Sequence, residues 1–462
     1  MKKRVLGFLI AFLLVFVLIG CDGVGNGDGN GGDNGNDKPP QGKPTEIVIM
    51  HGAVTEVDPR HKDFTGSEAA ARIALHEQIE EELNVKIVYK QYPADAPWGP
   101  GRRDAIIQWH AGGNAKADIY WITTIWLGEI MASNAIVPID SWLSRYGRNL
   151  DDSVLDMTTF DKKTWGFAPE PLNGEKGLFY NTAIIEELNL DDPVDLWNRG
   201  EWTWDKFEDY ALEAQAKIGS ERSVLGGYPA IWAESLVPLN GGYIVNPLLE
   251  KVGFTAPAAN AAYEYLSRLY DKGLFEESPK YDAGSELWGG GNVLFHPGNL
   301  WFVRADNRFG QYQFVKNGDI GVVPYPLPEG KTKDDYIIPI GGEAVYVVAA
   351  NPENRAKEEL AFEVWNRIQL WETLQSYEEN FEDWLVKVFD AEKFVDVYMQ
   401  IYNKVYYDAY TDLGFSQYGE HSWYSRVNLG VQDNTTRTKM EEIIAVYEEA
   451  LDRFLGKVAE EE

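Results

Sequence analysis

Cysteine is almost absent from this chain, in which Cys21 is the single one among 462 residues. One thiol cannot form an intrachain disulfide, and it cannot build a zinc site of several thiolates. Histidine is also scarce, with six residues and no pair at metal-ligand spacing. We therefore expect a fold without disulfides, and no metal ion or other cofactor.

Basic residues are too few to balance the acidic ones. The chain has 42 Lys and Arg against 73 Asp and Glu, a net charge of −31 with a pI near 4.6. Such an excess of acid repels nucleic-acid phosphate and anionic lipid surfaces, so we expect no nucleic-acid partner. Hydrophobic residues at 44% and aromatic residues at 13% are nevertheless typical of a globular protein.

Only one long apolar run is present, at the N-terminus. Basic residues 1–4 precede 16 apolar residues, 5–20, which as a helix measure about 24 Å. That is short for a bilayer core of about 30 Å and matches the apolar region of a signal peptide. The run ends at Leu18-Ile19-Gly20-Cys21, which resembles the bacterial lipobox. Residues 1–21 therefore predict a lipoprotein signal peptide with lipidation at Cys21; the alternative is an uncleaved signal anchor.

Residues 22–44 are a low-complexity stretch of Gly, Asn, Asp and Pro. Such a composition cannot bury a core, so we expect a disordered tether with a root-mean-square span of roughly 25–29 Å. A lipid anchor followed by a tether places the rest of the chain at the extracytoplasmic face of the bacterial cell membrane.

The remaining residues, 45–462, are too many for one compact core. Their beginning alternates between strand and helix patterns, which predicts a mostly parallel sheet with flanking helices in an α/β fold. The expected strands are 46–50, 85–89 and 117–122, and the expected helices are 67–83 and 102–110.

Several segments together resemble extracellular solute-binding proteins, family 1, the substrate-binding lipoproteins of ABC importers that include maltose-binding protein. They occur in the order of that family and span nearly all of the mature chain. Glu343 departs from the pattern, because the family usually has a small residue after the glycine pair. The segments are 117–121 with 126–127 and 135–140, then 164–169 with 177–181, 201–207, 261–275, 290–301, and 319–328 with 341–342.

The resemblance implies a two-lobed fold of the periplasmic-binding-protein type II, with a hinge between lobes that close over a ligand. On this basis we expect 45–168 with 303–349 in lobe 1, and 172–298 with 352–462 in lobe 2. The chain is then expected to cross between lobes near 169–171, 298–303 and 349–352. The implied partners of a monomer are a carbohydrate ligand and the transmembrane subunits of an ABC permease.

Residues that could hold a sugar combine aromatic faces with polar side chains at strand ends. Trp202, Trp204 and Phe207, in contrast, surround the capping residue Thr203 and are expected to be packing residues. Trp98, Trp232 and Trp288 are further aromatic candidates in loops. The expected ligand-binding residues are His51, Thr123, Thr124, Trp126, Trp165, Glu170, Trp301, Trp423 and Tyr424.

Two other functions remain open from the sequence. A secreted carbohydrate-active enzyme, either a glycosidase or a lyase, also needs aromatic clefts and carboxylates. No G-x-S-x-G or H-E-x-x-H motif is present, so we expect a binding protein and not an enzyme. A binding protein for a non-sugar ligand, such as a peptide or a polyamine, is the other alternative.

Overall fold

The computed structural model describes residues 42–160, 162–280, 283–371, 374–389, 391–415 and 419–455. The expected signal peptide, the lipidation site Cys21 and nearly all of the tether lie outside these residues. The chain divides into two compact units, 1–43 and 44–462, and the second contains all the strands and helices described below.

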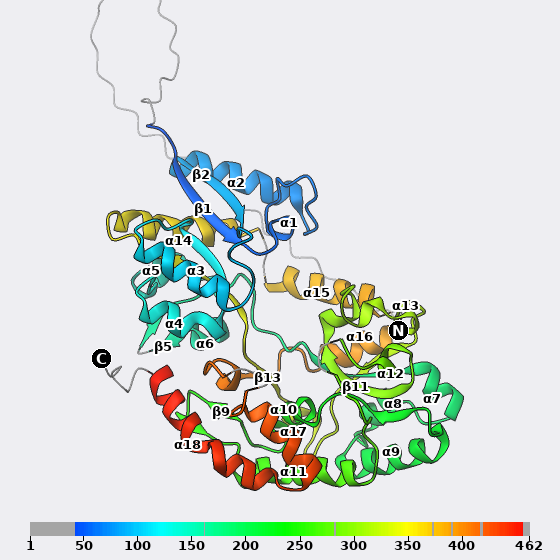
Figure 1. Ribbon diagram of the computed structural model, residues 1–462. Helices are drawn as coiled ribbons and strands as arrows, with labels where there is room; N and C mark the ends of the chain where they lie inside the picture. The colour runs from blue at the N-terminus through cyan, green and yellow to red at the C-terminus, as the bar shows by residue number, and fades with distance from the viewer. Residues whose placement is uncertain are drawn as a thin grey trace, which may run out of the picture. The chain divides into compact units, whose positions relative to one another are not determined.

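The first sheet has five strands in the order β2-β1-β3-β14-β4 (Figure 1). Its three N-terminal strands are parallel, and they follow the expected strand, helix, strand order closely. β1 alternates its side chains between two cores: Ile47 and Ile49 enter one, and Val48 and Met50 the other. The strands are β1 (Thr45–His51), β2 (Val85–Gln91), β3 (Ile119–Thr123), β4 (Ile136–Val137) and β14 (Ala344–Ala349).

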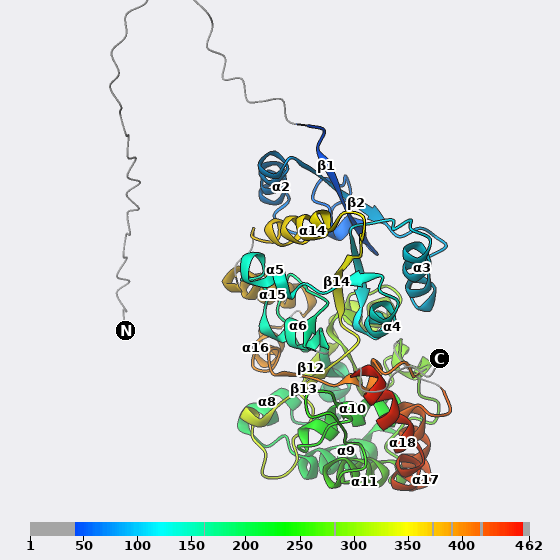
Figure 2. The ribbon, with the colours of Figure 1, turned by 90° about the vertical axis from the view of Figure 1, so that its left-hand side faces the viewer.

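Helices cover both faces of this sheet. Residues of α14 are buried with Ile47 and Ile49, and α14 also lies beside α2 and α5, as Figure 2 shows for the yellow and blue helices. The opposite face holds residues of α3 and α4. The helices around this sheet are α1 (Val54–Val57), α2 (Ala69–Leu83), α3 (Pro100–Ala111), α4 (Leu127–Ala132), α5 (Asp140–Tyr146), α6 (Asp152–Met157) and α14 (Arg355–Ile368).

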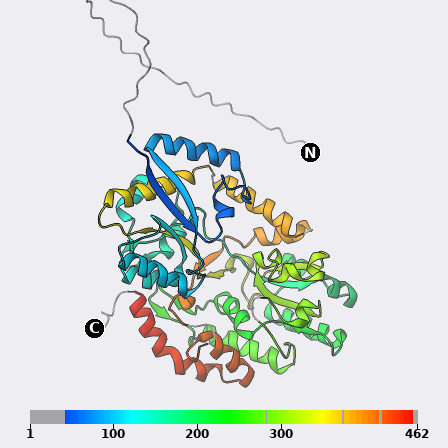
Figure 3. The same ribbon diagram turned by 45° about the horizontal axis from the view of Figure 1, so that its top comes forward.

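The second sheet has four strands in the order β12-β7-β11-β8. The C-terminal helices α17 and α18 pack beside α10 and α11, as the red and green ribbons in Figure 3 show. Its strands are β7 (Lys176–Asn181), β8 (Ser223–Leu225), β11 (Val293–Asn299) and β12 (Ile320–Val323), and its longer helices are α7 (Thr182–Leu188), α8 (Pro193–Arg199), α9 (Trp204–Ile218), α10 (Pro229–Leu239), α11 (Pro257–Asp271), α16 (Glu392–Met399), α17 (Trp423–Asp433) and α18 (Thr436–Phe454).

The start of α9 confirms the expected cap and packing. The Thr203 hydroxyl accepts a hydrogen bond from the Lys206 amide at 3.4 Å, which satisfies one of the free N–H groups of the first turn. Trp202, Trp204 and Phe207 are buried in the core of the second sheet. The indole of Trp204 stacks on Tyr265 with 4.5 Å between ring centroids. These aromatic residues therefore pack α9 against the second core.

Both sheets are mixed, which corrects the expectation of mostly parallel sheets. β14 is antiparallel to β3 and β4, and β7 is antiparallel to β11 and β12. The reason is the chain path, because β7 and β14 are each the first strand after the chain arrives from the other sheet. A strand that enters a sheet from the opposite side runs antiparallel to neighbours that are joined to one another by local strand-helix-strand connections.

The chain passes between the two sheets three times: from 168 to β7, from β13 to β14, and after α14. The first passage includes residues 169–171. The crossing expected near 298–303 is wrong, because β11 and β12 both pair with β7 in the second sheet. The structure differs from the expected lobe ranges in two places, because β12 pairs with β7 and α14 packs against α2 and α5. The connecting elements are β13 (Ile338–Ile340), which pairs with β15 (Val405–Tyr407), and α15 (Leu374–Val388).

Candidate functional site

The carboxyl ends of the parallel strands meet at one edge of the first sheet. β1 ends at His51, β2 at Gln91 and β3 at Thr123. In α/β sheets this edge is where ligands bind, since loops leave the strands there and their backbone groups are free of the ladder. The first passage between the sheets, residues 168–176, begins beside the same edge.

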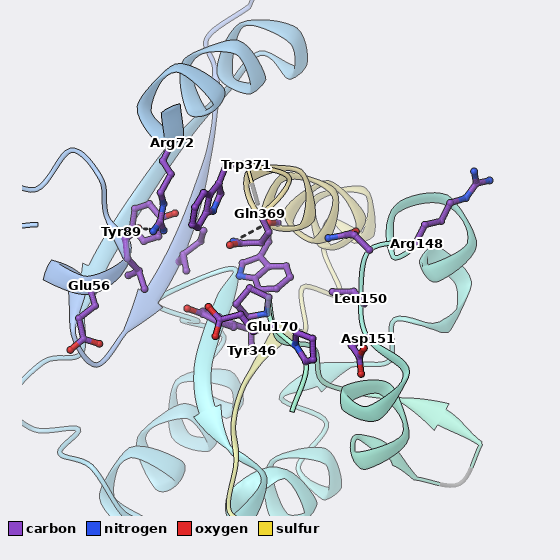
Figure 4. A pocket seen from close by; sticks show the side chains of 16 residues that line it. Glu56, Arg72, Tyr89, Arg148, Leu150, Asp151, Glu170, Tyr346, Gln369 and Trp371 are labelled. Atoms are coloured by element: carbon purple, nitrogen blue, oxygen red, sulfur yellow. Dashed lines mark hydrogen bonds between the residues drawn. The ribbon is translucent and has the colours of Figure 1, made fainter. Parts of the chain in front are cut away.

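A cavity of about 400 Å³ opens here (Figure 4). It is assembled from eight separate parts of the chain, which range from β1 to the residues after α14. Its lining residues are Ile49, Glu56, Val57, Arg72, Tyr89, Arg148, Asn149, Leu150, Asp151, Pro169, Glu170, Pro171, Tyr346, Trp365, Gln369 and Trp371.

Four aromatic side chains form walls of this cavity: Tyr89, Tyr346, Trp365 and Trp371. The rings of Tyr346 and Trp365 lie 5.1 Å apart between centroids. The guanidinium of Arg72 lies 4.9 Å from the centroid of the Trp371 ring, a cation–π contact that fixes both side chains. Aromatic faces of this kind suit the apolar C–H patches of a ring-shaped ligand.

Polar groups stand at the edges of the same walls. The Tyr89 hydroxyl is joined to His76 Nε2 at 3.0 Å, and His76 Nδ1 lies 2.6 Å from the carbonyl of Arg72. Burial lowers the pKa of His76 to about 4, so its ring is neutral at pH 7. Glu56 and Glu170 are exposed lining residues whose carboxylates can accept hydrogen bonds from hydroxyl groups.

His51 belongs to an aromatic cluster next to the cavity. Its ring lies 4.4 Å from Trp121 and 5.9 Å from Tyr346, and Tyr346 itself lines the cavity. His51 is only 4% exposed, and its Nδ1 accepts a hydrogen bond from the Ala53 amide at 2.9 Å. Burial lowers its pKa to about 4, and the nearby charge of Arg102 adds to this. His51 is thus a neutral supporting ring at the cavity edge.

The residues after β3 are placed at the expected edge, but they are buried. Thr123 donates its hydroxyl hydrogen to the Gly342 carbonyl at 2.7 Å, and Thr124 donates to Asp412 at 3.1 Å. Trp126 is 4% exposed, and its ring lies tilted against Trp98 with 4.7 Å between ring centroids. These three expected ligand residues therefore join parts of the protein to one another in this structure.

The other expected residues fall in four different surroundings. Glu170 lines the cavity of Figure 4, whereas Trp165 lines a different, mostly apolar cavity of about 440 Å³ between α4 and the end of α18. Trp301 follows β11 and is 40% exposed. Trp423 and Tyr424 are 0% and 1% exposed and lie in the core of the second sheet, so they offer no surface to a ligand in this conformation.

A second, smaller cavity of about 150 Å³ lies where the second sheet meets the passages. It is lined by the end of β11, residues 297–299, and by Phe302, the residue after Trp301. A salt bridge of 2.9 Å joins Lys176 and Glu234 in its wall, and the hydroxyl of Tyr410 donates to the same carboxylate. Both lobes thus present a cavity with charged and aromatic groups beside the segments that connect them.

Carboxyl groups with raised pKa values gather on these connecting segments. Burial, together with the charges of Glu175 and Asp412, raises the pKa of Glu343 to about 8. Loss of bulk water around Glu175 raises its pKa to about 7. Asp412 is buried, which raises its pKa to about 6 although it accepts hydrogen bonds from Tyr407, Thr411 and Thr124 and from the Gly342 amide.

Several cavity residues escaped the sequence analysis, notably Arg72, Tyr89, Gln369 and Trp371. Tyr89 had a usable signal, because it follows the buried alternation of β2 on the core side. Trp232 and Trp288, expected as loop or cleft residues, are both fully buried. Among the described residues no three His, Cys, Asp or Glu are grouped as a metal ion requires, and no described helix has the length and apolar character to span a membrane.

Comparisons with known proteins identify the family of this chain and its fold. The sequence model of the bacterial extracellular solute-binding protein family matches residues 63–364. A search of curated proteins finds no match. Among solved structures, a cyclic α-maltosyl-1,6-maltose binding protein from Arthrobacter globiformis is similar at 13% identity and TM-score 0.63, covering 88% of this chain and 99% of that one. The sugar-binding protein MalE from Xanthomonas citri is 13% identical with TM-score 0.61, covering 88% and 98%. These likenesses show the two-lobed type II fold.

Proposed function

Because the chain belongs to the family of bacterial extracellular solute-binding proteins, we propose that it captures an oligosaccharide between its lobes for an ABC importer. The observation that carries this proposal is the aromatic cavity of about 400 Å³ beside the first passage. Its walls combine Tyr89, Tyr346 and Trp371 with Glu56 and Glu170, the mixture of ring faces and hydroxyl acceptors that a sugar requires.

The ligand is proposed to contact both lobes. Glu170 and the aromatic cavity supply the first wall, while Trp301 and the smaller cavity after β11 supply the second. A ligand held this way favours closure of the two lobes over it, since each wall gains contacts only when they approach. Solved structures of similar fold include a substrate-binding protein from Listeria monocytogenes in complex with cycloalternan and one from Bifidobacterium longum in complex with lacto-N-biose, which supports a carbohydrate ligand.

Delivery to a membrane permease follows from the same proposal. Residues 1–21 would direct export, lipidation of Cys21 would anchor the protein at the extracytoplasmic membrane face, and residues 22–44 would tether it there. A lipid anchor keeps the loaded protein close to the transmembrane subunits, and the tether leaves its orientation free. The acidic exterior fits basic loops on the permease.

A glycan panel read by thermal and calorimetric binding tests the proposal. A ligand present at 100 times its dissociation constant stabilises the folded protein by about 2.7 kcal/mol, which shifts the melting temperature measurably. The sugar must be recovered unchanged after incubation. The Glu170→Gln and Trp301→Ala variants should bind more weakly at unchanged melting temperature. The control variant Leu248→Ala, at an exposed residue that lines neither cavity, should keep the affinity. Failure of every glycan to bind, or turnover of a glycoside, would refute a sugar-binding role.

A further inference from the structure

Arg102 is buried without a charged partner at the ligand edge of the first sheet. It lies in the first turn of α3 and is 5% exposed. Its guanidinium is surrounded by rings, 4.0 Å from the centroid of Tyr92, 5.1 Å from Trp98 and 6.0 Å from Trp121. Nε donates to the Ala96 carbonyl at 3.4 Å, but Nη1 has no hydrogen-bond partner.

Arg103, the adjacent residue, has the carboxylate partners that Arg102 lacks. Arg103 pairs with Asp104 at 2.8 Å and with Glu129 at 2.6 Å. No carboxylate of the described chain lies within salt-bridge distance of Arg102, although acidic residues outnumber basic ones by 73 to 42. A buried guanidinium lacking a counter-ion is costly to keep, and ring faces compensate only in part.

Arg102 Nη1, the atom without a hydrogen-bond partner, lies close to Gly52, the residue after β1. A Cβ atom added to Gly52 would stand 3.2 Å from Arg102 Nη1 and 2.6 Å from the Trp121 ring, so glycine permits this close approach. Trp121 in turn contacts His51, which contacts Tyr346 in the cavity wall. A continuous row of rings therefore leads from the cavity to Arg102.

Trp98 is the cover over this guanidinium. Trp98 is 55% exposed, and its ring lies tilted against Trp121 and Trp126, with 5.1 Å and 4.7 Å between ring centroids. It sits in a loop between Pro97 and Gly99, and Gly99 has a φ of +109°, which other residues rarely adopt. An exposed ring on such a loop can swing aside at small cost in buried area, and that movement opens Nη1 to a ligand.

We propose that the ligand is a carbohydrate bearing an anionic oxyacid group, and that Arg102 binds this group once Trp98 moves aside. This inference rests on the proposed sugar-binding function and adds the ligand class. A guanidinium presents parallel N–H donors that match the two oxygens of a carboxylate, and the contact is strong where water is excluded. Glu56 and Glu170 line the neighbouring cavity, so neutral sugar units occupy that end and the charged unit lies at Arg102.

Matched ligands test the charge preference in the wild-type protein. Oligogalacturonates are compared with their methyl esters, which keep the ring and linkage and lose the charge. A second arm compares sugar phosphates with their neutral parents and separates phosphate from carboxylate. Calorimetry should show the charged form binding about ten- to hundredfold more tightly, as expected for a buried charge-assisted contact.

Variants then assign the preference to Arg102. Arg102→Gln should remove the advantage of the charged ligand and leave the neutral one nearly unchanged. Arg102→Lys keeps the charge without the fork and should retain part of the preference. Arg103→Gln, the matched control, should alter neither ligand, because Arg103 is already paired. Melting temperatures verify that each variant folds.

The outcomes are distinct. Equal affinity for charged and neutral sugars, or a parallel loss of both in Arg102→Gln, overturns the anionic ligand and gives Arg102 a structural role only. If no sugar binds, glucuronate and inorganic phosphate are titrated into the wild type and into Arg102→Gln. Anion binding that depends on Arg102 would then support the anion site at Arg102 and overturn the carbohydrate as the ligand; the absence of anion binding would overturn both.

Discussion

Asp412 holds together three segments that meet between the two sheets, and its removal should loosen them. It accepts hydrogen bonds from Thr124 after β3 at 3.1 Å, from the Gly342 amide before β14 at 3.0 Å, and from Tyr407 of β15 at 2.6 Å. In an Asp412→Ala protein the Gly342 amide and the Tyr407 hydroxyl lose their acceptor. At roughly 1–3 kcal/mol for each buried donor left unpaired, the loss is about 2–6 kcal/mol.

The loss of unfolding free energy in Asp412→Ala should depend on pH, and the raised pKa of Asp412 fixes the direction of that dependence. The Asp412 pKa of about 6 lies above its usual 3.8, so the folded state holds the proton more tightly than the unfolded one. Its contribution to stability is therefore present at low pH and is lost as the pH rises through 6. Linkage makes the destabilisation by Asp412→Ala larger at pH 5 than at pH 8 by about 1.4 kcal/mol.

Asp408 provides the matched control. The pKa of Asp408 is also raised to about 6. Asp408 likewise accepts four hydrogen bonds, but none of the donors belongs to the first sheet. The donors are the amides of Ile244, Val245 and Tyr410 and the hydroxyl of Tyr406. Urea unfolding at pH 5 and pH 8 should show comparable losses for both variants. Small-angle scattering of the ligand-free protein should show a larger radius of gyration in Asp412→Ala alone. Equal expansion in both variants, or a larger stability loss at pH 8, would refute this reasoning.

Four further outcomes are expected. Trp301→Ala should weaken sugar binding several-fold at an unchanged melting temperature, because the ring is 40% exposed; a collapse of the melting temperature would make it a core residue. Wild-type stability should fall as the pH rises from 6 to 9, since Glu343 has a pKa of about 8, and Glu343→Gln should flatten that slope in urea titrations. Thr203→Ala should cost about 1 kcal/mol of unfolding free energy, and Thr203→Ser should restore it. Cys21→Ser should release the protein from the cell membrane into the medium, as seen by fractionation, if residue 21 is lipidated.

The local elements could be predicted from the sequence because their signals are local. The alternation in β1 and β2, the cap at Thr203 and the aromatic packing of α9 each depend on residues a few positions apart. The membership of β12 and α14 could not be predicted this way. The sequence pattern of each element is compatible with packing on either sheet. Only the pairing of β12 with β7 and the contact of α14 with α2 show to which sheet each element belongs.

The cavity was predicted only in part for the same reason. Glu170 was found because it lies in a proline-flanked passage, a feature visible in the sequence. Trp371 and Arg72 lie 299 residues apart, and no local pattern joins them although their side chains are in contact. Trp232 and Trp288 were placed in loops, but both indoles are needed to fill the second core. An abundance of tryptophan thus marks large cores as readily as binding surfaces.

Glu343, where the sequence departs from the family pattern, lies near other acidic residues on the segments that connect the two sheets. A small residue at this position would carry no charge, whereas Glu343 faces the fields of Glu175 and Asp412 on segments that connect the two sheets. Like charges that lie close together repel one another, and this repulsion adds to desolvation in raising the pKa of Glu343. Taking up a proton removes repulsion between the segments about which the lobes would turn. We therefore expect the packing of these segments to depend on pH through Glu175, Glu343 and Asp412, and a change in affinity with pH need not arise in the cavity itself.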